Sequence, residues 1–244
     1  MYRQTDSNSA YDAISNDYED YSLKKINYLN SIDKLVIKYS FKLCRTLDIG
    51  SGDGRRISKI TRETNPNDCL LIEPSDGMAK IAAENSNFNV IKSTAENLNL
   101  HNIGKFKNIY ALWNVFGHIQ TNEKRLKALK NIHDCMEDNG RFILDVNNRH
   151  NAASYGMVKV FWRRIIDYIY FKEARGDAKY DWKINGKIFK SFGHLFTPYE
   201  IEDLFHRSNF TILHKFSVDY ETGKIHNSLN KGQLFYVLTN KINV

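Results

Sequence analysis

Short apolar runs alternate along this chain with longer stretches in which apolar residues recur every three or four positions. The short runs predict β-strands at residues 46–50, 69–74, 89–93, 108–114 and 141–146. The longer stretches predict α-helices at residues 55–64, 75–85 and 122–137. Strands that are apolar on both faces and alternate with helices are typical of a parallel sheet covered by helices. We therefore predict an α/β fold with a doubly wound, mostly parallel sheet.

The segments around this alternation complete the predicted domain. Residues 11–40 carry apolar residues at helical spacing and predict one or two leading helices, the main part of an N-terminal helical cap at residues 1–42. Near the other end, Thr197-Pro198 opens a capped helix. Two last apolar runs, at residues 210–216 and 233–240, are expected to add antiparallel strands, which brings the sheet to seven.

Between the fifth strand and the capped helix the alternation stops. We interpret residues 150–193 as an insertion, with Asn185-Gly186 as the turn of a tight hairpin. Internal repeats and low-complexity linkers are absent from the sequence, so residues 1–244 are predicted to form one domain.

Composition narrows the classes of protein. With 42% apolar and 13% aromatic residues, the chain has enough apolar surface for one large core. It lacks an uninterrupted apolar run long enough to span a membrane, and its polar N-terminus lacks the apolar core of a secretory signal. Three scattered cysteines fit a reducing cytoplasm, which is the predicted location. No spacing of cysteines or histidines indicates a metal site.

The candidate chemistry begins where the first two predicted strands end. The loop after the first strand reads Asp48-Ile49-Gly50-Ser51-Gly52-Asp53-Gly54, and Glu73 ends the second strand. Alternate glycines let the backbone pass close beneath a ligand, and a carboxylate at the second strand end can accept hydrogen bonds from ribose hydroxyls. Both features are typical of nucleoside cofactor sites.

The spacing of the glycines separates two cofactor classes. A nicotinamide dinucleotide site has the pattern Gly-x-Gly-x-x-Gly, with the pyrophosphate at a helix N-terminus. This chain has Gly50-x-Gly52-x-Gly54 with Asp53 between the last two glycines. An acid there would repel a pyrophosphate but suits a ligand with a cationic amino-acid end. The pattern favours S-adenosylmethionine, and a nicotinamide-dependent reductase is the rival interpretation.

Taken in order, these segments resemble the class I S-adenosylmethionine-dependent methyltransferases of the small-molecule type. TLDIGSGDG resembles their first motif and IEP their second, while STAENL is similar to the segment beside the adenine. YALWNVFGHI, DNGRFILDV and FTPYEIEDLFHRSNF resemble later segments in the same order. The resemblance implies a Rossmann-like methyltransferase fold with an inserted substrate-binding segment, S-adenosylmethionine as the cofactor, and transfer of a methyl group.

The resemblance also implies roles for single residues. The implied cofactor-binding residues are Tyr18, Gly50, Ser51, Gly52, Asp53, Glu73, Pro74, Met78, Thr94, Ala95, Glu96, Trp113 and Asn114. For Met78 and Glu96, ordinary packing is the alternative. The leader tyrosines Tyr11, Tyr18 and Tyr21 either fold over the cofactor or pack the first helix on the sheet.

Methyl transfer from a sulfonium needs a close and aligned nucleophile, and a general base only when the acceptor is a hydroxyl or an ammonium. Two histidines are candidate bases: His118, after the fourth strand, and His194, before the capped helix. Asn147 and Arg149 follow the fifth strand and are candidate acceptor-binding residues. Arg149 could anchor an anionic group.

The predicted insertion carries most of the charge of the chain. Residues 149–190 hold ten Lys and Arg against four Asp and Glu, a net charge of +6 where the whole chain has +7. This composition fits a lid for an acidic or partly apolar acceptor, a membrane-surface helix, an RNA contact, or a packed helix and hairpin with a solvated basic face.

We thus predict methyl transfer to an oxygen or nitrogen of a small molecule. The alternatives are a methyltransferase of modified tRNA nucleosides and a non-catalytic cofactor-binding subunit, and a homodimer is possible.

Overall fold

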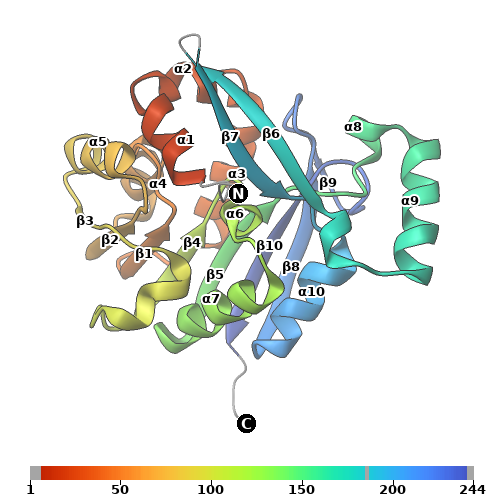
Figure 1. The fold of residues 1–244 in the computed structure, drawn as a ribbon. Coiled ribbons are helices and arrows are strands. Elements are labelled where there is room, and N and C mark those ends of the chain that lie inside the picture. The colour runs from red at the N-terminus through yellow and green to blue at the C-terminus, as the bar shows by residue number, and fades with distance from the viewer. Residues whose placement is uncertain (1–6, 185–186, 241–244) are drawn as a thin grey trace.

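A mixed sheet of eight strands forms the centre of the protein (Figure 1), seen in a computed structural model that describes residues 7–184 and 187–240. The strands are β1 (Arg45–Ile49), β2 (Asp68–Ile72), β3 (Asn89–Ile91), β4 (Phe106–Ala111), β5 (Met136–Val146), β8 (Phe210–Val218), β9 (Ile225–His226) and β10 (Gln233–Asn240). Their order across the sheet is β3-β2-β1-β4-β5-β10-β8-β9.

The first five strands of this order are parallel, and β10 runs antiparallel to both of its neighbours, β5 and β8. The chain builds outward from β1 to β3 and then returns to place β4 on the other side of β1. The order of strands therefore reverses between β1 and β4. In doubly wound sheets, ligands bind outside the carboxyl ends of the strands at such a point.

Helices cover both faces of the sheet and enclose two hydrophobic clusters. On one face the covering helices are α3 (Ile26–Tyr39), α4 (Arg55–Thr64) and α5 (Asp76–Ser86). On the other face they are η2 (Ala95–Leu100), α6 (Val115–His118), α7 (Asn122–Asp134) and α10 (Pro198–Arg207). Fully buried β10 lies between these layers, as its unbroken apolar run predicts.

The predicted fold class is confirmed, with differences at three strands. α7 ends at Asp134 and β5 begins at Met136, inside the helix predicted at residues 122–137 and five residues before the predicted strand start, because Met136 already pairs with Phe106 of β4. The sheet has eight strands and not seven, because the two residues of β9 pair with the end of β8. β4 ends at Ala111, although residues 108–114 are apolar enough to suggest a longer strand. Trp113 and Asn114 have φ angles of 63° and 66°, and this left-handed backbone turns the chain away from the sheet.

The N-terminal segment and the second half of the predicted insertion lie above the carboxyl ends of the strands. Short helices α1 (Ser7–Ile14), η1 (Ser15–Asp17) and α2 (Tyr18–Leu23) precede α3. The second half of the insertion is an antiparallel hairpin of β6 (Asp177–Ile184) and β7 (Lys187–His194), which packs on α1 and α6 (Figure 1). The Asn185-Gly186 turn lies outside the described residues.

The first half of the insertion takes a different direction. It forms α8 (Ala152–Tyr155), α9 (Met157–Ile169) and η3 (Glu173–Arg175), and Figure 1 shows α9 at the edge of the molecule, away from the hairpin. Among the described residues, no helix is both long and apolar enough to cross a membrane.

A buried hydrogen-bond network joins the leading helices to the sheet. The Tyr28 hydroxyl on α3 donates to Asp145 Oδ2 on β5 at 2.6 Å, and the Trp113 amide donates to Asp145 Oδ1 at 2.7 Å. All the hydrogen-bonding atoms of the Asp145 carboxyl are therefore engaged between α3 and the loop after β4. Because Asp145 is 1% exposed, water cannot replace a lost partner.

We predict that Tyr28→Phe lowers the free energy of unfolding by about 1–3 kcal/mol, since it leaves a buried carboxyl oxygen without its donor. Urea denaturation would measure the change. Tyr39→Phe on the same helix is the matched control, because the Tyr39 hydroxyl makes no hydrogen bond within the described residues and its loss should cost little. Equal stabilities of the two variants would contradict this role of Asp145.

Candidate functional site

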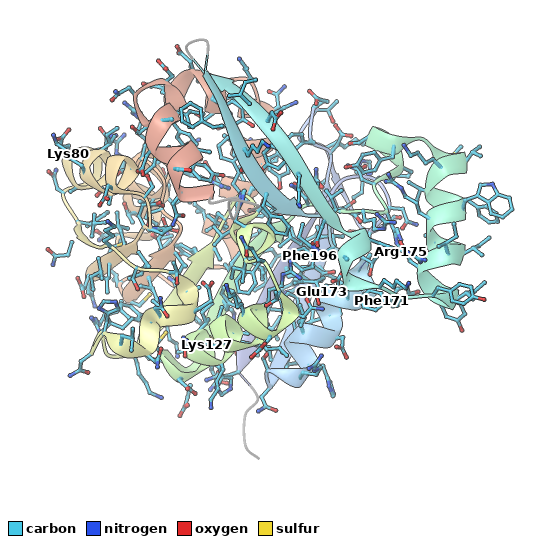
Figure 2. All side chains as sticks on the ribbon, viewed as in Figure 1. Lys80, Lys127, Phe171, Glu173, Arg175 and Phe196 are labelled. Atoms are coloured by element: carbon cyan, nitrogen blue, oxygen red, sulfur yellow. The ribbon has the colours of Figure 1, made fainter. Side chains whose placement is uncertain are left out.

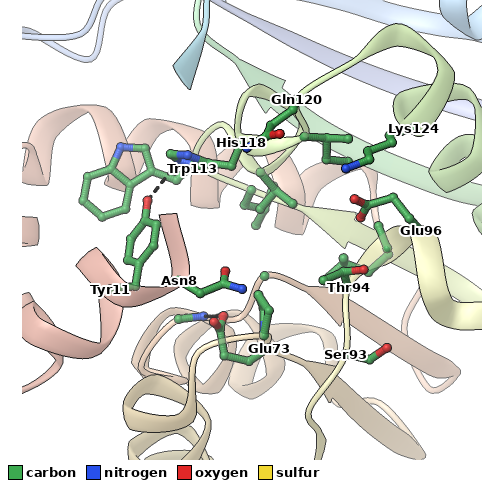
Figure 3. Close-up of a pocket in the computed structure, with 18 of the residues that line it drawn as sticks. Asn8, Tyr11, Glu73, Ser93, Thr94, Glu96, Trp113, His118, Gln120 and Lys124 are labelled. Carbon is green, nitrogen blue, oxygen red and sulfur yellow. Dashed lines mark hydrogen bonds between the residues drawn. The ribbon is translucent and has the colours of Figure 1, made fainter. Parts of the chain in front are cut away.

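A cavity of about 600 Å³ lies at the carboxyl ends of β1, β2 and β4, where the order of strands reverses (Figure 3). Residues of α1 and Tyr18 of α2 close it from the side opposite the sheet. Its described lining comprises Asn8, Tyr11, Tyr18, Ile49, Gly50, Gly52, Glu73, Pro74, Ser93, Thr94, Ala95, Glu96, Leu112, Trp113, Val115, His118, Ile119, Gln120 and Lys124. A volume of this size is typical of small-molecule and cofactor sites.

Glu73 ties the two loops at the base of this cavity together. Its Oε2 accepts a hydrogen bond from the Gly52 amide at 2.8 Å, and its Oε1 accepts one from the Ser75 amide at 3.0 Å. Each carboxylate oxygen retains a further lone pair for a ligand hydroxyl. The side chain lies at the cavity wall although the residue is only 5% exposed.

Burial raises the pKa of Glu73 to about 7, against the lowering effect of the two amide donors. Burial also raises the pKa of the neighbouring Asp48 to about 7. The amide donors beside Glu73, and Ser51 with Arg56 beside Asp48, offset only part of this effect of burial. A ligand that offers hydroxyl donors or positive charge would stabilise the ionised form.

In the glycine-rich loop, the backbone passes close to neighbouring side chains. Gly50 and Gly52 have φ angles of 69° and 57°, which favour glycine. A Cβ on Gly50 would lie 2.5 Å from a methyl group of Val115, and one on Gly52 would meet the ring of Tyr18 at 3.4 Å. A side chain on Gly50 would therefore collide with Val115, and one on Gly52 would lie against the Tyr18 ring that lines the cavity.

Aromatic rings form the wall next to this loop. The Trp113 ring lies 5.7 Å from the ring of Tyr18 and 5.9 Å from that of Tyr21, measured between centroids. The Trp113 indole N–H donates to the Tyr220 hydroxyl at 3.2 Å, which fixes the ring from behind. Electron-rich ring faces attract cations. This wall is suited to a positively charged ligand group.

His118 ends the short helix α6 that follows Trp113 and Asn114, and it is held at both ring nitrogens. Nδ1 lies 2.9 Å from the Phe192 carbonyl oxygen on β7, and Nε2 lies 3.0 Å from the Tyr11 hydroxyl (Figure 3). Because a carbonyl only accepts, Nδ1 carries the proton and Nε2 is the acceptor of the Tyr11 O–H. Burial lowers the pKa of His118, so the ring is neutral at pH 7 with a basic nitrogen beside the cavity.

The structure brings most of the predicted site residues together. Those that line the cavity are Tyr18, Gly50, Gly52, Glu73, Pro74, Thr94, Ala95, Glu96, Trp113 and His118. They come from α2, from the ends of β1, β2 and β4, from η2 and from α6. A single cavity thus connects segments that are far apart in the sequence.

Four residues predicted to bind the cofactor lie beneath the cavity wall and support it. Ser51 donates from Oγ to the Asp48 carbonyl at 2.9 Å, and Asp53 pairs with Arg55 at 2.7 Å. Met78, in the first turn of α5, is fully buried. The Asn114 side chain accepts from the Asn147 amide at 2.9 Å and so holds the turn after β4 against the end of β5.

The structure does not bring the remaining three predicted residues to the cavity. His194 is fully buried, with Nδ1 2.8 Å from Asp177 Oδ1 and Nε2 3.0 Å from Glu200 Oε1, so both ring nitrogens are engaged in tying the hairpin to α10. Arg149 donates from Nε to Asp167 at 2.8 Å. The Asn147 amide is used by Asn114, and Asn147 is not among the lining residues.

Several lining residues were not predicted from the sequence. Asn8, Ser93, Gln120 and Lys124 belong to this group, as do the apolar side chains of Leu112, Val115, Ile49 and Ile119. Gln120 and Lys124 come shortly after the predicted His118. A sequence analysis that extended the site along the loop after the fourth strand could have included them. Asn8 has no local signal, because its place depends on how α1 packs on the hairpin and α5.

The charged residues that line the cavity indicate whether a dinucleotide or a nucleoside with a cationic side chain fits it. Two acids, Glu73 and Glu96, and one base, Lys124, line the cavity among the described residues. A pyrophosphate needs donors or cations at a helix N-terminus, but Arg55 at the start of α4 is paired with Asp53 and Glu19. The residues present fit a nucleoside with a cationic side chain better than a dinucleotide. Within the described part of the chain, no cluster of His, Cys, Asp or Glu could hold a metal ion.

Comparison with known proteins agrees with this geometry. Residues 22–215 match the model of a family described as methyltransferase domain, so the chain belongs to that family. The resemblance to class I S-adenosylmethionine-dependent methyltransferases is thereby confirmed. Among curated proteins, none matches the chain significantly.

Solved structures share the fold at low sequence identity. DhpI in complex with SAM and HEP has a TM-score of 0.70 and 11% identity, with 98% of this chain and 99% of that chain covered. The CcbJ methyltransferase from Streptomyces caelestis has a TM-score of 0.64 and 11% identity over 87% of this chain and 90% of that chain. A possible histamine N-methyltransferase from Thermotoga maritima has a TM-score of 0.61 and 17% identity over 95% and 98%.

We predict that the Glu73 carboxyl makes stability fall as the pH rises. Its pKa is about 7 in the folded chain and has the ordinary value of 4.5 in the unfolded chain, so the folded chain retains a proton between these values. The free energy of unfolding should therefore decrease by about 1–3 kcal/mol between about pH 5 and about pH 8 through this group.

Urea denaturation of wild type and Glu73→Gln across this range would isolate the contribution, since glutamine does not titrate. Asp48→Asn is the parallel control for the second buried carboxyl. If wild type and Glu73→Gln lose stability equally as the pH rises, Glu73 does not titrate as described.

Proposed function

We propose that this protein transfers a methyl group from S-adenosylmethionine to an oxygen or nitrogen of a small-molecule acceptor. The main support for this proposal is the set of groups that line the cavity. It has a buried carboxylate beside the glycine-rich loop, an aromatic wall, and a neutral histidine with a basic Nε2. Family membership supports the class of reaction.

In this proposal Glu73 accepts hydrogen bonds from the ribose hydroxyls, which strengthens its ionised form. Gly50 and Gly52 leave room for the amino-acid portion, and the rings of Tyr18 and Trp113 face its positive charge. Pro74, Thr94, Ala95 and Glu96 surround the adenine. When bound, the cofactor supplies a methyl group on a sulfonium that is already an activated leaving group.

His118 is the residue we propose to receive a proton from the acceptor. The Phe192 carbonyl holds the proton on Nδ1, so that Nε2 is free to accept. The Tyr11 hydroxyl occupies Nε2 in the described structure, and an acceptor hydroxyl or amine would take that place or donate through Tyr11. Burial raises the pKa of Tyr11, which keeps this hydroxyl protonated and able to donate.

A small acceptor is favoured by the way Asn8 and Tyr11 of α1 and Tyr18 of α2 close over the cavity. Among the similar structures, one is described as a possible histamine N-methyltransferase, and histamine is a small molecule. The tRNA acceptor, the homodimer and the cytoplasmic location stay predictions, since no observation in the site bears on them. Asn147 and Arg149 have no part in this proposal.

We predict that His118→Ala slows methyl transfer by about 100- to 10,000-fold, the range typical of a lost general base, and weakens cofactor binding far less. The test has two steps. Small hydroxyl and amine metabolites and bulk tRNA are first screened for transfer of a labelled methyl group, and the variant is then assayed with the acceptor found.

His206→Ala is the matched control, because His206 is an exposed histidine on α10, outside the cavity. Its rate should equal that of wild type. A full rate in His118→Ala would show that the base lies elsewhere or is not needed, and transfer to tRNA alone would overturn the small-molecule proposal.

A further inference from the structure

On helix α9, charged side chains face the body of the protein and apolar side chains face solvent, which is the opposite of what is expected for a surface helix. Its one acid, Asp167, faces the body, where it accepts from Arg149 Nε at 2.8 Å and lies 3.0 Å from His150 Nε2. Arg163 also faces inward, with its guanidinium group 4.5 Å from the centre of the Tyr155 ring and a hydrogen bond to the Arg149 carbonyl. A helix exposed to water normally places such groups outside.

The apolar side chains of α9 are exposed instead. Tyr168 is 87% exposed, Met157 79% and Trp162 58%. The full exposed apolar set of this segment is Met157, Val158, Phe161, Trp162, Ile166, Tyr168, Ile169, Tyr170 and Phe171. Five of the nine are aromatic, and a contiguous exposed surface of this kind marks an interaction site. We call this set the α9 apolar face.

Basic residues border the α9 apolar face on both sides. With 3.6 residues per turn, the exposed apolar residues of the helix fall on one half of its circumference. Lys159 lies at one border and Arg164 at the other, and both are exposed. Lys172 follows the helix and is exposed too. The helix has no second acid, so its outer surface is apolar in the middle and cationic at the rim.

The position of α9 leaves this surface accessible. Figure 1 shows α9 at the outer edge of the molecule, and Figure 2 shows Phe171 on the segment that continues from it. A groove of about 1080 Å³, lined by residues of α9 and α10, separates the helix from the body. The helix is bonded to the body through its polar inner side. Part of the α9 apolar face (Met157, Phe161, Tyr168, Ile169 and Phe171) lines this groove opposite α10, whereas Val158, Trp162, Ile166 and Tyr170 are not among its lining residues.

We propose that the α9 apolar face docks the protein on the surface of an anionic lipid bilayer, with the helix lying in the plane of the interface. Apolar and aromatic side chains would enter the boundary between headgroups and acyl chains, where tryptophan and tyrosine are favoured. Lys159, Arg164 and Lys172 would lie at the level of the anionic headgroups. This inference does not depend on the proposed function.

The charge pattern favours lipid over a second copy of the chain. If two copies paired their α9 apolar faces about a two-fold axis, each basic border would meet the basic border of its partner. The outer surface of α9 offers no acid to neutralise that contact. An anionic bilayer supplies the missing negative charge along the whole helix.

Vesicle flotation tests this inference with the full-length protein. Vesicles of equal parts phosphatidylglycerol and phosphatidylcholine are expected to carry the protein upward, and vesicles of phosphatidylcholine alone are not. Binding should weaken between about 0.1 M and about 1 M salt, since the screening length falls from about 10 Å to about 3 Å. The double variant Phe161→Ser/Trp162→Ser should bind anionic vesicles at least about tenfold more weakly.

Leu100→Ser is the matched control, because Leu100 is 74% exposed and lies on η2, away from α9. It should float like wild type. Circular dichroism and S-adenosylmethionine binding of each variant would establish that it is folded. Arg164→Glu keeps the apolar face intact and should also reduce flotation with anionic vesicles, which separates the charge effect from any effect on folding.

Two results would overturn the inference. One is a wild-type protein that does not float with anionic vesicles, or floats no better than the double variant. The other is a stable dimer in sedimentation experiments without lipid that the double variant converts to a monomer, which would assign the α9 apolar face to a second copy.

Discussion

The site depends on one carboxylate that accepts hydrogen bonds from two loops. Glu73 links the Gly52 amide, in the loop after β1, to the Ser75 amide, at the start of α5. Because its side chain is buried, the two loops are fixed at the point where the order of strands reverses. Burial raises the pKa of this carboxyl to about 7. The protein therefore stabilises the ionised form of Glu73 only in part, and this carboxyl faces the cavity. A ligand with hydroxyl donors completes its hydrogen bonding.

A second carboxylate, Asp145, fixes the wall of the cavity that carries Trp113. It binds the Tyr28 hydroxyl and the Trp113 amide, and so connects the leading helix α3, the turn after β4 and the end of β5. The strained backbone at Trp113 and Asn114 is maintained by these contacts and by the bond from the Asn147 amide to Asn114. The result is a wall whose aromatic face is turned toward the cavity. His118 follows on the same turn, which places its basic nitrogen within reach of an acceptor.

The sequence predicts the parts of this arrangement that are set locally. Apolar runs predict the parallel strands, and the glycine spacing with Glu73 predicts the ligand end of the sheet. The left-handed turn at Trp113 was not predictable, because its stability comes from Asp145, more than thirty residues later. Likewise His194 reads as a candidate base until its partners Asp177 and Glu200 are known. Arg149 reads as an anion anchor until Asp167 on α9 is seen to neutralise it. Long-range pairing decides each of these cases.

Calorimetric titration of the wild-type chain with S-adenosylmethionine, and separately with a nicotinamide dinucleotide, would show directly which cofactor the cavity binds. We predict binding of S-adenosylmethionine alone, with a Kd of about 1–100 μM. We also predict that Glu73→Ala weakens the binding free energy of S-adenosylmethionine by about 1–3 kcal/mol, through the missing charged hydrogen bonds. Glu84→Ala, which removes an exposed acid from α5, should bind as wild type does. Binding of the dinucleotide, or unchanged affinity in Glu73→Ala, would contradict the assignment of the cavity.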